Sequence, residues 1–375
     1  MGSMFSSNKE YNLTDHGHSD RALFEEYVAS ADIFMDLTDK VVAITGTSAG
    51  SLGFYLAEIA IRKNAKIVVL LNRDSSSAKK GQDELLAIAT AHSSSASSPS
   101  CVIQSITCDM QDLASVKNAA EQVKAIAAAN GGLDVLINNA GIMATRDLRT
   151  ADGFEIQMQT NQLSHFLLTY MLYDALEEAA THRGEARLVT HSSSARFGPG
   201  SMLEEAYFGK CGPNTLGGDQ TWIISELCGK AGPWTRYHQT KLANAVFAMA
   251  MHEKLKAKGS KVKALSADPG LASSNLQVNS TKGDGLMSGW MAKMIMPGGH
   301  SAENGSLDAG MAAFGKDAAS GTFYAPKGGM KGPPVTRIVD GHEIKKGSEK
   351  LVCSKENQEN VWKWCEEALG ITFVI

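Results

Sequence analysis

The sequence lacks the features that mark membrane-spanning and nucleic-acid-binding proteins. Its 375 residues include no apolar run of about 18 residues, the length that would suggest a membrane-spanning helix. Lys and Arg number 36 against 40 Asp and Glu, whereas nucleic-acid-binding domains usually carry a clear basic excess. The composition, with 43% hydrophobic and 20% charged residues, is typical of a globular protein. We therefore expect no transmembrane helix and no nucleic-acid partner.

Cysteine is scarce and scattered along the chain. No C-x-x-C pair and no Cys/His cluster occurs, so the sequence predicts neither a disulfide framework nor a bound metal. Reduced thiols favour a reducing compartment, either the cytoplasm or an organelle lumen. The first residues do not form a secretory signal, and a targeting peptide that had been cleaved would leave no trace in the sequence. The six cysteines are Cys101, Cys108, Cys211, Cys228, Cys353 and Cys365.

From residue 40 onward, short apolar segments alternate with segments of helical periodicity. Apolar strands between helices are typical of a parallel sheet that is covered on both faces. We predict an α/β fold, a Rossmann-type doubly wound parallel sheet, in a single domain over 39–375 that follows an N-terminal extension over 1–38. The predicted strands are 41–44, 66–71, 102–107, 134–137, 186–190 and 261–266, and the predicted helices are 56–61, 82–91, 113–129, 154–180 and 237–256.

Two long irregular insertions, 195–234 and 271–300, interrupt this alternation. Such segments in a compact domain are usually functional loops, so we predict that both form a lid over the substrate. The second insertion contains an apolar stripe at helical spacing, which we expect to face either the substrate cavity or a membrane surface. Ordinary core packing is the alternative explanation of its methionines. The stripe consists of Leu286, Trp290, Met291, Met294 and Ile295.

A glycine-rich turn, Thr-Gly-Thr-Ser-Ala-Gly-Ser-Leu-Gly over 45–53, joins the first predicted strand to the first predicted helix. Glycines here let the backbone turn tightly and approach a pyrophosphate, and the helix N-terminus offers N–H groups to the phosphates. The context of strand, turn, helix and strand therefore predicts a dinucleotide cofactor. The residues expected to contact it are Gly46, Ser48, Gly50, Ser51, Leu52 and Gly53.

The second strand ends at Asn72 and Arg73. An acidic residue near this point would bind the ribose 2′-hydroxyl of NAD, whereas an arginine can pair with the 2′-phosphate of NADP. We therefore predict NADP(H) as the cofactor, with Asn72 and Arg73 among its contacts. The alternative is that Arg73 is an ordinary surface arginine.

Three later motifs stand where predicted elements end or begin: Asn-Asn-Ala-Gly over 138–141 closes the fourth strand, Ser-Ser-Ser over 192–194 closes the fifth, and Tyr-x-x-x-Lys over 237–241 opens a helix. In this order, together with the glycine turn, they resemble the short-chain dehydrogenase/reductase superfamily. Asp109 after the third strand and Asp-Pro-Gly over 268–270 extend the resemblance. It implies an oxidoreductase that moves a hydride between a nicotinamide cofactor and a carbonyl or alcohol.

Tyr237 and Lys241 are four residues apart, so they share one face of a helix. A nearby ammonium lowers the pKa of a phenol, which prepares Tyr237 to exchange a proton with the substrate oxygen. The resemblance implies that Ser193 binds the same oxygen, that Lys241 also binds the cofactor ribose, and that Asn161 carries a water-linked proton relay to Lys241. Taken singly, each could be an ordinary surface polar residue. Further cofactor contacts implied by the resemblance are Asp109, Met110, Asn138, Ala140, Gly141, Pro269, Gly270 and Leu271, besides Tyr237 and Lys241.

The sequence departs from the family pattern at two places. One extra residue separates Gly50 from Gly53, and Ser193 lies much further from Tyr237 than is usual in the family.

Residues 152–169 and the Lys-Leu-Ala-Asn sequence at 241–244 resemble the retinol-dehydrogenase-like and protochlorophyllide-reductase-like branch. This branch implies a bulky, apolar small-molecule substrate and allows peripheral contact with a membrane. Two alternatives stay open: reduction of a carbon–carbon double bond in a pigment-like substrate, and a non-catalytic NADP-binding subunit. The oligomeric state is not predicted.

Overall fold

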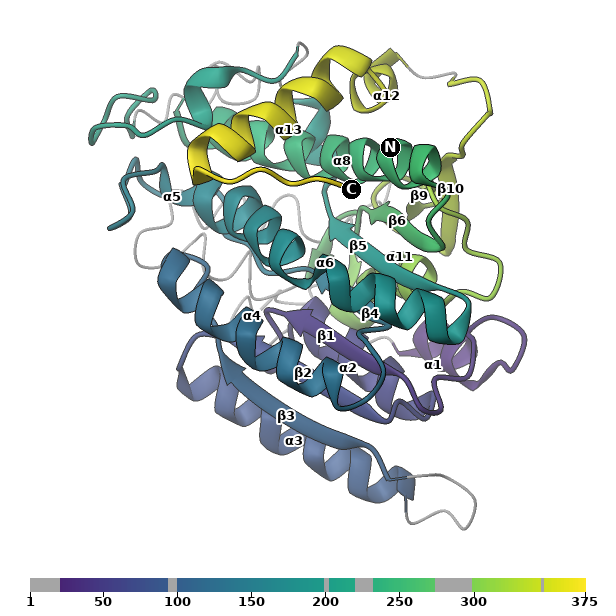
Figure 1. Cartoon of the computed structure of the whole chain (residues 1–375). Helices are drawn as coiled ribbons and strands as arrows, with labels where there is room; N and C mark the ends of the chain where they lie inside the picture. The colour runs from purple at the N-terminus through teal and green to yellow at the C-terminus, as the bar shows by residue number, and fades with distance from the viewer. Residues whose placement is uncertain (1–20, 94–99, 199–201, 220–231, 274–298, 345–346) are drawn as a thin grey trace, which may run out of the picture.

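The computed structural model describes residues 21–93, 100–198, 202–219, 232–273, 299–344 and 347–375. Its centre is an eight-stranded sheet in the order β10-β9-β6-β5-β4-β1-β2-β3 (Figure 1). Neighbouring strands are parallel throughout, except that β10 runs antiparallel to β9. The strands are β1 Val41–Thr45, β2 Ile67–Asn72, β3 Val102–Thr107, β4 Val135–Asn138, β5 Ala186–His191, β6 Val262–Ala267, β9 Phe323–Pro326 and β10 Pro334–Ile338.

Helices cover both faces of the sheet, which confirms the predicted doubly wound fold. The central strands β1, β2, β4 and β5 are buried at every residue, because side chains on both faces meet helices. On one face the core is shared with α4 Leu113–Ala128, α6 Ser164–Arg183, α8 Gly232–Lys258 and α13 Lys355–Leu369. On the other it is shared with α1 Ala22–Ala29, α2 Leu52–Arg62, α3 Ser76–Ser93 and α11 Ala302–Phe314.

The strand order places a switch point between β1 and β4. The chain leaves β1 toward β2 and β3 on one side and later returns to β4 and β5 on the other. Open sheets of this kind bind ligands in the crevice beyond the carboxyl ends of the strands at that point. The candidate site residues after β1, β2, β4, β5 and β6 therefore meet at one edge of the sheet.

The helix predicted over 154–180 is interrupted in the structure. A short α5, Ile156–Met158, passes into a π-helical turn, Gln159–Leu163, and only then into α6. Hydrophobic periodicity does not reveal such a turn, although π-helical turns are frequent at functional sites. The turn contains Asn161.

Residues 21–38 of the predicted N-terminal extension pack against the sheet domain, and residues 1–20 lie outside the described part. Phe24 and Val28 of α1 are buried. Arg21 pairs with Glu58 of α2 at 2.5 Å, and Arg62 of α2 pairs with Glu25 at 2.7 Å. Apolar burial and two ion pairs thus fasten this segment to α2.

The described part of the first insertion includes η2 Ser194–Phe197 and η3 Glu205–Tyr207. Residues just after η3 pack on α13: the ring of Phe208 lies 5.4 Å from that of Trp364. The amide N–H of Leu203 donates to Asn357 Oδ1. The stretch 202–208 is therefore fixed to the C-terminal helix.

The two ends of the second insertion pair with each other. β7 Ala272–Ser273 lies parallel to β8 His300–Ser301. The predicted apolar stripe, Leu286 to Ile295, lies outside the described residues, so the structure does not test it. The remaining element is α12, Gly347–Val352, which precedes α13.

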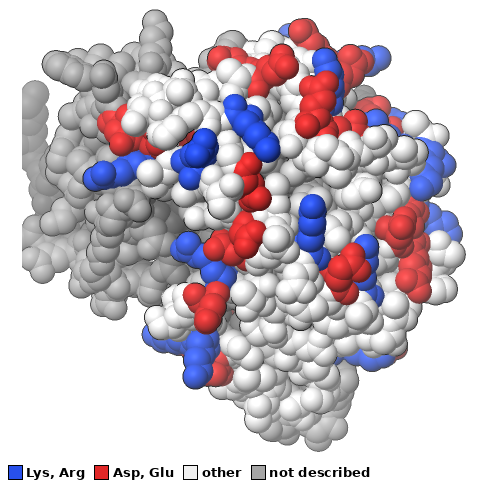
Figure 2. Space-filling model, turned by 60° about the vertical axis from the view of Figure 1, so that its left-hand side comes forward, with Lys and Arg blue, Asp and Glu red and all other residues white. Residues whose placement is uncertain are grey.

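Basic and acidic side chains are interspersed on the face drawn in Figure 2, where neither sign forms a continuous patch. Within the described ranges, no helix has both the length and the apolar character needed to cross a bilayer.

Candidate active site

A cavity of about 880 Å³ lies at the carboxyl ends of the strands. Sixteen of the twenty predicted site residues line it; Gly50, Gly53, Asn138 and Asn161 do not. Asn138 points away from it, because its amide donates to Thr169 Oγ1 in the core. Those that line the cavity are Gly46, Ser48, Ser51, Leu52, Asn72, Arg73, Asp109, Met110, Ala140, Gly141, Ser193, Tyr237, Lys241, Pro269, Gly270 and Leu271.

The glycine turn forms one end of the cavity. Ser51 caps α2, since its Oγ accepts from the N–H of Phe54 and donates to the carbonyl of Gly46. Gly53 packs so closely that an added Cβ would lie 2.4 Å from the Gly46 oxygen. The extra residue between Gly50 and Gly53 thus leaves the contact between turn and helix intact.

Neighbouring elements hold this turn from two sides. Asn139 Nδ2 donates to the carbonyls of Thr45 and Gly46, at 2.8 and 3.1 Å. On the other side Gly81 of α3 lies so close that a Cβ would stand 2.7 Å from the Ala49 nitrogen. The conformation of the turn therefore depends on two residues that sequence reasoning did not select.

Asn72 and Arg73 differ in their surroundings at the end of β2. The Asn72 side chain is buried and occupied, because its Oδ1 accepts from the N–H of Thr47 and its Nδ2 donates to Thr47 Oγ1, both at 2.7 Å. Arg73 is exposed at the cavity wall, beside Ser75 and Ser77. Asn72 shapes the turn, and Arg73 leaves its guanidinium available to a ligand.

Ser193 and Tyr237 meet at the other end of the cavity. Ser193 follows β5 and caps η2, and it forms a side-chain hydrogen bond with Tyr237, which is 3% exposed. Its neighbour Ser192 instead donates to the main-chain carbonyl of Lys241. Of the two serines, Ser193 is the one whose hydroxyl is placed beside the phenol.

Lys241 lies behind Tyr237, and its ammonium is 5.8 Å from the centre of the tyrosine ring. It donates to the carbonyl of His191 at 2.9 Å and to Asn244 Oδ1 at 3.3 Å. Burial lowers the pKa of Lys241 to about 8, an effect that the charge of Asp268 partly opposes. Burial raises the pKa of Tyr237 above its ordinary value, and the hydrogen bond from Ser193 opposes that shift. Tyr237 is therefore protonated at neutral pH.

Asn161 is held by the loop after β4. Its Oδ1 accepts from the N–H of Ile142 at 2.8 Å, and its Nδ2 donates to the Ile142 carbonyl and to Thr240 Oγ1. The π-helical turn thus brings the Asn161 side chain against Thr240 of α8, the residue before Lys241.

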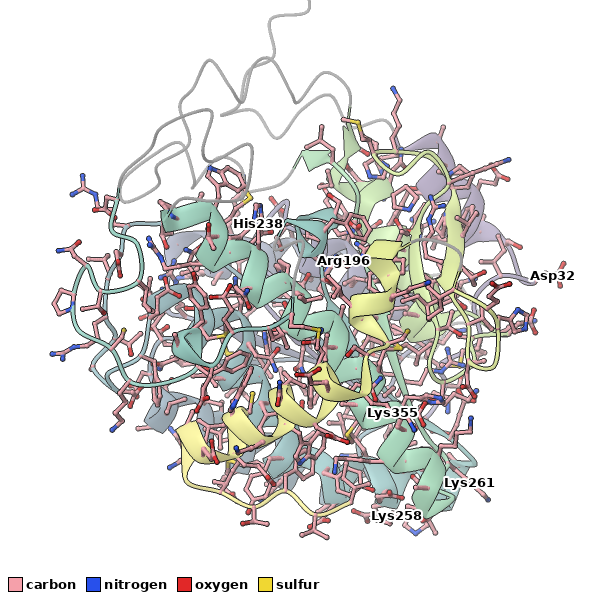
Figure 3. The ribbon with its side chains drawn as sticks, turned by 90° about the horizontal axis from the view of Figure 1, so that it is seen from above. Asp32, Arg196, His238, Lys258, Lys261 and Lys355 are labelled. Atoms are coloured by element: carbon pink, nitrogen blue, oxygen red, sulfur yellow. The ribbon has the colours of Figure 1, made fainter. Side chains whose placement is uncertain are left out.

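Arg196 is a buried cation that sequence reasoning missed. It pairs with Asp268 at 2.5 Å and with Glu349 of α12 at 2.8 Å, and it donates to the carbonyl of Ser193 at 2.9 Å. Figure 3 labels it next to the C-terminal elements. It ties together the ends of β5 and β6, on which Ser193 and Pro269 sit, so the buried charges of Arg196 and Lys241 are balanced by two carboxylates.

The cavity wall near Tyr237 is mostly apolar. It includes Met143, Phe197 and Trp234, whose ring lies 6.1 Å from that of Tyr237. His238, labelled in Figure 3, also lines this end, and burial lowers its pKa to about 4, so it is neutral. Sequence reasoning did not select these residues: Met143 and Phe197 come from the segments after β4 and β5, and Trp234 and His238 from the first turns of α8.

Three comparisons bear on identity. Residues 40–207 match the family model described as short chain dehydrogenase. Human polyprenol dehydrogenase is 28% identical over 247 residues, covering 65% of this chain and 64% of that protein. Bovine retinol dehydrogenase 12 is 30% identical over 256 residues, covering 68% of each. The chain belongs to the short-chain dehydrogenase/reductase family.

Within that family it lies in the retinol-dehydrogenase-like branch, as the sequence predicted. Two proteins of solved structure with the same fold, 22% and 19% identical to this chain, are described as complexes with NADPH and with NADH. A Mycobacterium paratuberculosis protein of solved structure has the same fold, with a TM-score of 0.63, 24% identity and coverage of 93% of this chain and 98% of that one. The match spans 55–64% of the length of the first three curated relatives.

Proposed function

We propose that this protein is an NADPH-dependent reductase of a carbonyl group on a bulky, apolar molecule. The observation that carries the proposal is the placement of Ser193, Tyr237 and Lys241 at one end of a cavity whose other end is the glycine turn. A cofactor that spans the cavity between the turn and Lys241 would bring its nicotinamide to the hydroxyls of Ser193 and Tyr237.

The residues present fit a dinucleotide that carries a 2′-phosphate. The turn and the N-terminus of α2 would hold the pyrophosphate, since helix N-termini favour anions. Arg73, with Ser75 and Ser77 beside it, would hold the 2′-phosphate. The carboxylate among the described lining residues, Asp109, would lie near the adenine. An arginine at the end of the second strand favours NADP(H) over NAD(H).

The bound reduced nicotinamide supplies a hydride to the carbonyl carbon of the substrate. Tyr237, protonated at neutral pH, then gives its proton to the carbonyl oxygen, and Ser193 donates a hydrogen bond to the same oxygen. The alcohol product thus carries the hydride on its carbon and the proton from Tyr237 on its oxygen. Lys241 stabilises the tyrosine phenolate that remains. A tyrosine that is protonated at neutral pH is ready to act as the acid that carbonyl reduction requires.

The apolar end of the cavity supports a large hydrophobic substrate. Among the described lining residues the charged ones are Arg73, Asp109 and Lys241, which leaves the wall formed by Met143, Phe197 and Trp234 without charge. Two relatives are named for retinol and polyprenol, both apolar alcohols. We propose a substrate of this chemical class, with insertions 195–234 and 271–300 of the single domain covering it.

The test is consumption of NADPH with retinaldehyde as the probe, followed by absorbance and by chromatography of the alcohol formed. We expect retinol and oxidised cofactor in equal amounts, and much slower turnover with NADH. Failure to reduce retinaldehyde, a polyprenal or a simple aromatic aldehyde with either cofactor would refute the proposal.

A further inference from the structure

Asn244 of α8 bridges two residues of the candidate active site. Its Oδ1 accepts from the Lys241 ammonium at 3.3 Å, while its Nδ2 donates to the main-chain carbonyl of Asn161 at 2.7 Å. The same Nδ2 donates to Gln162 Oε1 at 2.9 Å. Asn244 is 4% exposed, so water does not compete freely for these bonds.

The Asn161 carbonyl has a second donor, His165 Nδ1, at 2.9 Å. A carbonyl only accepts, so Nδ1 carries the proton and Nε2 accepts from Thr45 Oγ1, 2.9 Å away. Burial lowers the pKa of His165 to about 4, which keeps this imidazole neutral. The Asn161 carbonyl therefore accepts from two side chains, those of Asn244 and His165.

We propose that Asn244 is a positioning residue of this active site, whose amide holds the Lys241 ammonium against the Asn161 backbone. The inference rests on the proposed function. An amide does not carry protons onward, so Asn244 fixes the charge of Lys241 beside Tyr237 and sets the pH range in which that charge persists.

Within the described residues, few other charged groups surround the Lys241 ammonium, so its bond to Asn244 should affect its pKa. On α8, Lys241 faces Tyr237. The Asp268 carboxylate at the end of β6 raises the pKa of Lys241, and this carboxylate is also paired with Arg196. His191 of β5 and His165 of α6 are both neutral, with pKa values lowered by burial. In the described structure, two oxygens accept directly from the ammonium, those of His191 and Asn244.

The test replaces Asn244 in two opposite ways. Asn244→Leu removes the acceptor and should lower the pKa of Lys241, whereas Asn244→Asp adds a negative charge and should raise it. We expect shifts of opposite sign, each about one pH unit. The Lys241 signal, assigned with Lys241→Met, is titrated by NMR in protein containing isotope-labelled lysine. The alkaline limb of the pH profile for retinaldehyde reduction should move in the same directions.

Gln162→Leu is the matched control, because Gln162 bonds the same amide without touching Lys241 and should leave the titration in place. If Asn244→Leu does not fold, Asn244→Ser, which is too short to reach the ammonium, replaces it. The proposal would be overturned if the pKa of Lys241 in both Asn244 variants equalled that of the parent, or if Gln162→Leu shifted this pKa as much as the Asn244 variants do. The NMR titration needs no substrate, so absence of reductase activity would count against the proposed function alone.

Discussion

Arg73 is the residue on which cofactor choice depends in this account. Its guanidinium is exposed at the cavity wall, whereas Asn72 beside it is fully engaged by Thr47. Arg73→Ala should weaken NADPH binding by about 10- to 100-fold and leave NADH binding nearly unchanged, since a hydrogen bond to a charged group contributes about 1.5–3 kcal/mol. Fluorescence titration of both cofactors measures the two dissociation constants.

Lys66→Ala is the control for that comparison. Lys66 is also exposed and lies at the opposite end of β2, far along the strand from the cavity. It should leave the preference for NADPH unchanged. Equal affinity of the parent protein for NADPH and NADH would contradict the role given to Arg73.

At the scale of elements, the packing of α3 against the glycine turn gives a prediction that helix propensity alone would reverse. Alanine is favoured over glycine inside a helix by about 1 kcal/mol, so propensity predicts that Gly81→Ala stabilises α3. The structure predicts the opposite, because the new Cβ would meet the Ala49 nitrogen at 2.7 Å and the Thr47 oxygen at 2.8 Å. Overpacking of this kind costs about 1–3 kcal/mol.

We therefore expect Gly81→Ala to lower both the melting temperature and the affinity for NADPH. Gly209→Ala is the control, since nothing lies within 4 Å of the position of its Cβ. Thermal unfolding with and without NADPH measures both effects. Gain of stability with unchanged affinity would show that α3 does not constrain the turn.

The sequence predicted β1 to β6 to within about two residues. The strands β1, β2, β4 and β5 are buried on both faces and therefore form short apolar runs, whereas the edge strand β3 is mostly exposed. It did not predict α11, α12, α13, β9 or β10, which carry no recognisable site motif. The π-helical turn at Asn161 was missed because periodicity cannot separate it from the helix around it. Glu349 and Trp364 act only through tertiary contacts with Arg196 and Phe208, and no sequence pattern marks such contacts. The catalytic and cofactor roles of the site residues stay predictions.

At the scale of the whole molecule, burial of Lys241 makes stability depend on pH. Its pKa in the folded protein is about 8, against an ordinary 10.5, so between these values only the folded state has lost the proton. Stability attributable to Lys241 is therefore low below pH 8 and rises as the pH increases toward 10.5. The rise is at most about 3 kcal/mol, at about 1.4 kcal/mol for each unit of pKa.

Denaturant unfolding of the cofactor-free parent and of Lys241→Met across this pH range isolates that contribution. The difference between their free energies of unfolding should increase with pH in favour of the parent. A constant difference would mean that the ammonium is not buried in the way described.

The most direct test of the account compares the parent with Tyr237→Phe for NADPH-dependent reduction of retinaldehyde, with exposed Tyr170→Phe as the control. Tyr237→Phe keeps the ring packed against Trp234 but removes the proton donor. We predict unchanged NADPH affinity and turnover reduced by about 100-fold or more, the contribution typical of a general acid. Turnover at the parental rate in Tyr237→Phe would contradict the central claim that Tyr237 protonates the substrate.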